Sequence, residues 1–255
     1  MSINWPLIIV LFCLSIPGTL IAIKRLIYFL LPDNTEELKK RVCRFAMIQT
    51  LILILIMCFT GAIISTSTGL HAPILEALLV GKVGFSALIP ILLPAVLFAI
   101  LCLTIFCFLY YILAKRLIDE KSRVIMMKLR QALGIDGCIL YGGVVEEIIG
   151  RWGILNLTTF FAVIFTKQLS PLILWTSIII SGLIFAMGQL PTYIAAGCTS
   201  NRWFIYFFIV LSMCQSIIFG YVFWQYGLIC AIFAHMLFHL GWALVDDKLK
   251  SSITH

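Results

Sequence analysis

The sequence predicts an all-α protein that crosses a membrane several times as one helical bundle. Of its 255 residues, 62% are hydrophobic and only 11% are charged, whereas a soluble domain carries about 25% charged residues. The charges gather in short stretches, and the apolar runs between them reach the ~20 residues that a helix needs to span a bilayer. The composition therefore excludes a soluble domain, and we expect about eight membrane-spanning helices.

Three spans are expected in the N-terminal half, where the charge-poor runs cover residues 5–31, 45–64 and 83–114. The first run is long and reaches Lys24 and Arg25 near its end. It lacks the charged start and the small-residue cleavage site of a signal peptide. We therefore interpret it as a retained helix.

Three more helices are expected after a polar stretch that runs from Lys115 to Arg130. Their approximate limits are 134–150, 154–166 and 171–190. The first of them carries two adjacent acidic residues near its end.

The last apolar run, residues 203–245, contains no Asp, Glu, Lys or Arg. As a single helix it would be ~65 Å long, about twice the hydrocarbon thickness. It must fold back on itself, and Gln225-Tyr226-Gly227 is the best position for the turn. This gives a seventh and an eighth helix.

Two basic clusters predict the orientation in the membrane. Basic loops between spans face the cytoplasm, which places the N-terminus outside. The excess of Lys and Arg in these loops also explains the net charge of +7, so no nucleic-acid partner is needed to account for it. The clusters comprise Lys24, Arg25, Lys39, Lys40, Arg41 and Arg44, and Lys115, Arg116, Lys121, Arg123, Lys128 and Arg130.

The nine cysteines lie mostly within apolar runs, and no Cys-x-x-Cys pair occurs. Cysteine in such surroundings behaves as a small hydrophobic residue. Neither a disulfide framework nor a thiolate metal site is indicated.

Glu146 and Glu147 are the most informative residues of the chain. A carboxylate in hydrocarbon costs roughly 2.5–3.5 kcal/mol on insertion scales, so such residues usually face a cavity or a partner. Arg151 follows Glu147 by four residues, the favoured order for a helical ion pair. Glu146 is turned ~100° away and is left to act as a general base. The alternative is an ion pair that only holds helices together.

Polar residues on two further expected helices complete the candidate site. His235 and His239 share one face of the last helix, because they are four residues apart, and Gln189 ends the sixth helix. Hydrogen bonds between helices would also explain them. A zinc site of Glu146, His235 and His239 is a further alternative, although the His-Glu-x-x-His order of classical zinc proteases is absent.

These residues form three motifs in order, Glu146-Glu147-x-x-x-Arg151, Phe185-x-x-x-Gln189 and His235-x-x-x-His239. The set resembles the motifs of the CAAX-processing and bacteriocin-processing intramembrane protease family, also called CPBP or Abi. The run from Phe219 to Leu228 is similar to the turn that precedes the last motif of that family. The resemblance covers about residues 135–245.

The resemblance implies a role for each matched residue. Glu146 would match the acid that activates the attacking water, and Glu147 and Arg151 its supporting pair. His235 would match the histidine that stabilises the oxyanion.

Two positions depart from the family pattern. The family has His where this chain has Gln189, and usually Asn where it has His239. Glutamine donates a hydrogen bond but cannot carry a proton as histidine can.

The expected organisation has three parts: N-terminal helices and basic loops at 1–133, a core with the motifs at 134–245, and a short polar tail at 246–255. The expected function is an intramembrane endopeptidase in the bacterial cytoplasmic membrane, with no cofactor. Its partners would be the bilayer and a peptide or lipidated-protein substrate, such as a prenylated CAAX-type, leader or bacteriocin-type peptide.

Two other functional classes remain open at this point. A protein of this fold with a degraded site would be a scaffold, an immunity protein or a regulator of a membrane partner, and Gln189 favours that interpretation. A proton-coupled transporter is opposed by the absence of an inverted repeat and of matching helices broken by Gly or Pro.

Overall fold

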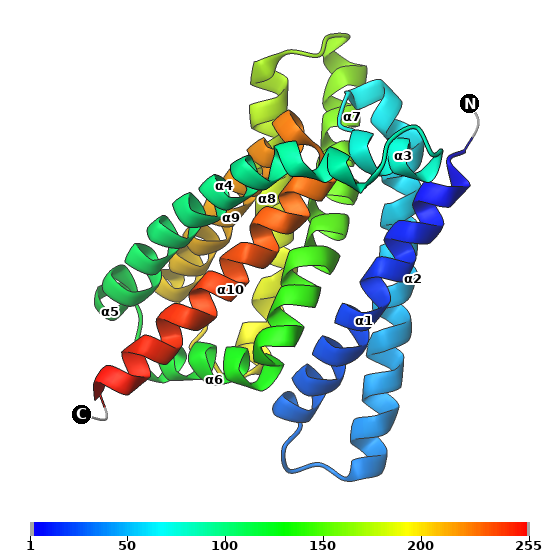
Figure 1. Ribbon diagram of the computed structural model, residues 1–255. Coiled ribbons are helices and arrows are strands. Elements are labelled where there is room, and N and C mark those ends of the chain that lie inside the picture. Colours follow the sequence, from blue (N-terminus) through cyan, green and yellow to red (C-terminus); the bar gives the residue numbers. More distant parts are fainter. Residues whose placement is uncertain (1–2, 254–255) are drawn as a thin grey trace.

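The chain folds into a bundle of helices, seen in a computed structural model that describes residues 3–253, with side chains described for 3–246 (Figure 1). No strand occurs in this described part. Seven of its helical stretches are long and apolar enough to cross a membrane. The all-α membrane fold is confirmed, with seven spans in place of about eight.

The helical elements follow one another with short connections. Asn4, Thr35, Asp119, Ser170 and Asn201 cap five of the helices, each accepting a backbone N–H near the start of its helix. In chain order the elements are α1 (Trp5–Leu30), α2 (Glu36–Thr68), α3 (Pro73–Leu79), the 3₁₀-helix η1 (Phe85–Leu88), α4 (Ile89–Cys107), the π-helix η2 (Phe108–Leu113), α5 (Ala114–Leu117), α6 (Glu120–Gly137), the π-helices η3 (Cys138–Val145) and η4 (Ile148–Leu155), α7 (Asn156–Thr166), α8 (Pro171–Ala195), α9 (Arg202–Tyr226) and α10 (Leu228–Ile253).

The outer surface of the bundle is apolar, as a lipid-facing surface must be. Phe85, Ile89, Phe165 and Leu172 are largely exposed. Soluble proteins rarely expose a continuous apolar surface of this size to water. The exposed side chains therefore agree with a multi-pass membrane protein.

The expected break between a fourth and a fifth span is wrong. Residues from Glu120 to Thr166 form one helical stretch, which bends at Gly134, where φ is 73°. The charged Arg151 lies inside this stretch and finds its partners within the bundle, so the chain has no need to leave the membrane there. The polar stretch from Lys115 to Arg130 lies mostly in helix α6, the first part of this helical stretch. Helix α6 lies across one end of the bundle (Figure 1).

The turn expected near residue 227 is confirmed. Helix α9 ends at Tyr226, and Gly227 has φ 82°, a conformation that favours glycine. A Cβ atom there would also meet the ring of Pro73. The expected polar tail continues α10 as far as Ile253, and residues 254–255 lie outside the described part.

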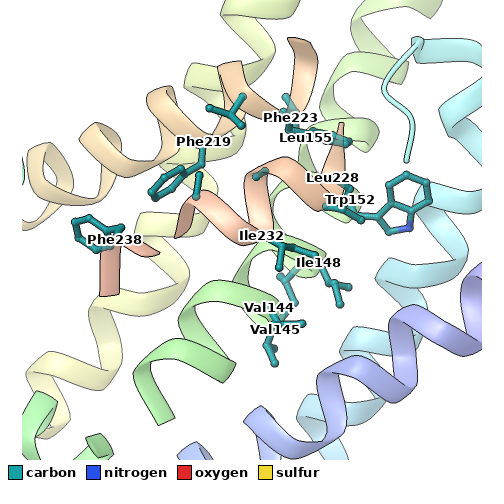
Figure 2. Packing of buried hydrophobic residues seen from close by; sticks show 14 of the residues in the cluster. Val144, Val145, Ile148, Trp152, Leu155, Phe219, Phe223, Leu228, Ile232 and Phe238 are labelled. Atoms are coloured by element: carbon teal, nitrogen blue, oxygen red, sulfur yellow. The ribbon is translucent and has the colours of Figure 1, made fainter. Parts of the chain in front are cut away.

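The core surrounds η3 and η4, which meet α9 and α10 in the middle of the bundle. Figure 2 shows Ile148 beside Ile232 and Leu155 beside Phe223. The Trp152 indole N–H donates to the Cys58 carbonyl at 3.2 Å, which ties η4 to α2. This packing fixes the direction in which the acidic pair points.

We expect Gly61→Ala to destabilise the bundle, because a methyl group at this position would overlap the Trp152 indole. Overpacking of this kind costs about 1–3 kcal/mol. Gly188→Ala is the control: no atom lies within 4 Å of the added carbon, and Ala in a helix gains roughly 0.5–1 kcal/mol over Gly. Thermal unfolding in detergent should separate the two variants, and equal melting temperatures would contradict the packing described.

Candidate functional site

The two acids occupy the junction between η3 and η4, where a pair of wide π-type helical segments meet. Such segments are rare and often occur at functional sites. Glu147 is fully buried, whereas Glu146 is half-buried and lines a cavity. Adjacent residues of the same type thus have different surroundings.

Glu147 is the centre of a buried polar cluster. Its Oε1 atom lies 2.7 Å from His235 Nδ1 and 3.4 Å from Arg151 Nη1. The predicted Glu147–Arg151 ion pair is confirmed. Because the carboxylate of Glu147 accepts, the proton of this contact lies on His235 Nδ1. The cluster joins η4 to α10.

Arg151 connects the same cluster to two other helices. Its Nη2 atom donates to the Gln215 carbonyl of α9 at 3.1 Å. The guanidinium carbon lies 5.9 Å from the Phe185 ring and 5.8 Å from the Phe219 ring, within cation–π range. Arg151 thus has partners on α8 and α9 as well as Glu147.

Glu146 points away from this cluster and towards α8. Gln189 Nε2 donates to its Oε1 atom at 2.8 Å. Both residues line a cavity of about 110 Å³, which we call the central cavity. They also line a larger neighbouring space of about 360 Å³ with mostly apolar walls, the apolar cavity. The Glu146–Gln189 pair therefore lies where the two cavities meet.

The two histidines stack on each other at 4.8 Å between ring centres, with planes 16° apart. His235 also stacks on Phe219 at 4.4 Å. His239 lines the central cavity, and neither of its ring nitrogens has a hydrogen-bond partner in the described part of the chain. Gly142 makes room for it, because a Cβ atom there would overlap His239 Nε2.

The structure gathers the predicted residues into one region but in two groups. Glu146, Gln189 and His239 line the central cavity, and Arg151 also reaches its wall. His235 does not line it and contacts Glu147 behind it. The Nδ1 atom of His235 holds the supporting acid, and its Nε2 atom is buried without a hydrogen-bond partner among the described residues.

The metal alternative finds no support in the geometry. Among the described residues, no group of three or more His, Cys, Asp and Glu side chains is close enough to hold a metal ion. Glu146, His235 and His239 are therefore not arranged as a ligand set.

Sequence reasoning missed several residues around the site. Gly142 and Gly143 allow η3 to approach α10 closely, since added methyl groups would overlap His239 and Met236. A pair of small residues in a membrane helix was the available signal. The carbonyl of Gln215 carries no such signal, because any residue supplies one.

Residues 131–241 match the family model described as Rce1-like, type II CAAX prenyl endopeptidase Rce1-like. No curated protein and no solved structure shows a significant match. The matched region contains the acidic pair, Arg151, Gln189 and both stacked histidines.

The two adjacent acids should differ in their effect on stability. Glu147→Gln leaves the buried Arg151 without its counter-charge, and breaking a buried pair in this way costs about 3–5 kcal/mol. Glu146→Gln, the matched control, retains an amide that can still bond Gln189 and leaves the ion pair intact. We expect a large fall in melting temperature for Glu147→Gln and little change for Glu146→Gln. The reverse order would exchange the roles of the two acids.

Proposed function

We propose that the chain is a working intramembrane endopeptidase that cleaves a lipid-modified peptide, a function supported by the match of residues 131–241 to the Rce1-like type II CAAX prenyl endopeptidase family model. The observation that carries the proposal is the division between the acids. Glu147 is held by Arg151 and His235, whereas Glu146 faces the central cavity. This arrangement provides one structural acid and one acid positioned for chemistry.

Glu146 acts as the general base in this proposal. A water molecule in the central cavity gives a proton to the carboxylate, and its oxygen attacks the scissile carbonyl carbon. The tetrahedral intermediate then collapses, the C–N bond breaks, and the proton on Glu146 passes to the leaving amine. In the described part of the chain, Glu146 receives one hydrogen bond, from Gln189, which orients the carboxylate without neutralising it.

We assign the oxyanion contact to His239. Its ring lines the central cavity, and its nitrogens are buried without partners. An unmade hydrogen bond of this type costs about 1–3 kcal/mol, so a substrate oxygen that accepts one is favoured. His235 supports His239 by stacking and holds Glu147 in place.

The apolar cavity suits the lipid part of a prenylated substrate. Its walls include Ala22, Ile23 and Leu26 of α1 and Leu53 of α2, and its inner end reaches Glu146. An isoprenoid chain placed there packs against apolar side chains and brings the adjoining peptide to the base. This fit favours a prenylated peptide over an unmodified leader or a bacteriocin.

One observation favours a non-enzymatic alternative. The residue that bonds Glu146 is Gln189, and an amide cannot exchange a proton with the acid as an imidazole can. A chain with this change could bind lipidated peptides without cleaving them. It would then serve as a membrane scaffold or a regulator.

Cleavage of a prenylated peptide by the purified protein separates the two functions. Glu146→Ala should lower the rate by a factor of roughly 10²–10⁴, the usual contribution of a general base. Gln189→His should preserve or raise it, whereas Gln189→Ala, the control, should lower it by loss of the hydrogen bond.

Two outcomes would contradict the proposal. If the wild-type protein is inactive and Gln189→His cleaves the peptide, the natural protein is a binding protein on a protease fold. If cleavage survives Glu146→Ala, the acid is not the base.

A further inference from the structure

Arg130 of α6 is held at the wall of the central cavity by residues that the reaction does not use. Its guanidinium carbon lies 3.4 Å from the Trp242 ring, and it forms an ion pair with Asp246. The Trp242 indole N–H donates to the Tyr111 hydroxyl at 3.0 Å, and this hydroxyl donates to Asp246. Residues of two other elements, η2 and α10, therefore fix the position of this cation.

One edge of this guanidinium has no hydrogen-bond partner among the described residues. Asp246 accepts from Nη1, whereas Nε is buried and has no partner among the described residues. The side chain as a whole is 12% exposed. Arginine binds carboxylates through two parallel N–H donors, so the edge that carries Nε is suited to a second carboxylate. A buried cation that is only partly paired favours an anionic ligand.

The cavities on either side of Arg130 give this ligand a place in the substrate. On one side, the central cavity meets the apolar cavity at Glu146 and Gln189. On the other side lies a third cavity of about 370 Å³, which we call the exit cavity, and it shares Arg130 and Cys138 with the central cavity. The substrate would therefore pass from the apolar cavity to Glu146, then to Arg130 and finally to the exit cavity.

We propose that Arg130 binds the free C-terminal carboxylate of the substrate peptide, an inference that rests on the proposed protease function. Trp242 contacts both Arg130 and His239, with ring centres of Trp242 and His239 6.4 Å apart. The Trp242 ring therefore lies between the Arg130 guanidinium and His239, the residue that we assign to the reacting carbonyl. Arg130 and Glu146 line the same central cavity, and two or three extended residues, which span ~7–10 Å, are the length of chain that we assign between the carboxylate and the cleaved bond.

Two prenylated peptides of identical sequence, one ending in a carboxylate and the other in an amide, test this assignment. The wild-type protein should prefer the carboxylate by about 10-fold or more in kcat/KM, and Arg130→Gln should bring the ratio close to one. Arg123→Gln is the matched control, because Arg123 also lies on α6 and has a buried Nε without a partner among the described residues. This control should keep the wild-type ratio.

Asp246→Asn distinguishes substrate binding from a structural ion pair. It breaks the same pair as Arg130→Gln but retains the guanidinium, so the preference for the carboxylate should stay equal to or exceed that of the wild type. A purely structural pair predicts that both variants lose activity on both peptides with an unchanged ratio. That result, or a wild-type ratio near one, would overturn the assignment.

Binding keeps this test separate from the test of hydrolysis. If neither peptide is cleaved by the wild-type protein, the protease function fails, and the dissociation constants of the same two peptides then decide the role of Arg130. Tighter binding of the carboxylate that disappears in Arg130→Gln supports the assignment. Equal binding of the two peptides overturns it.

Discussion

The buried carboxylate of Glu147 is the group on which the arrangement of the site depends. It accepts from His235 on α10 and pairs with Arg151 on η4, and Arg151 in turn bonds a carbonyl of α9. A charge at this depth is tolerated because Glu147 Oε1 faces both His235 and Arg151, while Glu147 Oε2 and His235 Nε2 have no hydrogen-bond partner in the described part of the chain. The cluster therefore fixes three helical segments relative to one another, and this arrangement directs Glu146 to the other side of its helix.

Much of the fold could be predicted from the sequence, because membrane spans are set by the length and charge of apolar runs. The need for a turn in residues 203–245 followed from the bilayer thickness, and Gln225-Tyr226-Gly227 gave its position. The false break after Gly150 shows the limit of that reasoning. Arg151 suggested an exit from the membrane, whereas the structure satisfies its charge internally through Glu147 and Gln215. A single sequence does not show which charges find partners.

The candidate site was predictable to a similar extent. Spacing by four residues indicated the Glu147–Arg151 pair and the common face of the two histidines. It could not assign His235 to Glu147 and His239 to the cavity, since that depends on how α10 rotates against η3. The close approach at Gly142 and Gly143 settles this rotation. The Arg130–Asp246 pair joins residues 116 positions apart, and no local pattern connects them.

The proposed chemistry joins an apolar space for a lipid to a small polar cavity that contains an acid, and Glu146 belongs to both. The Gln189 amide orients this acid and leaves proton transfer to Glu146 alone. Incubation of the purified protein with a farnesylated C-terminal peptide in water enriched in ¹⁸O, followed by mass spectrometry of the fragments, tests this account most directly. The account predicts a new carboxyl group that carries one ¹⁸O atom, formed by the wild-type protein and not by Glu146→Ala. An intact peptide after prolonged incubation with the wild-type protein, or fragments without the label, would contradict it.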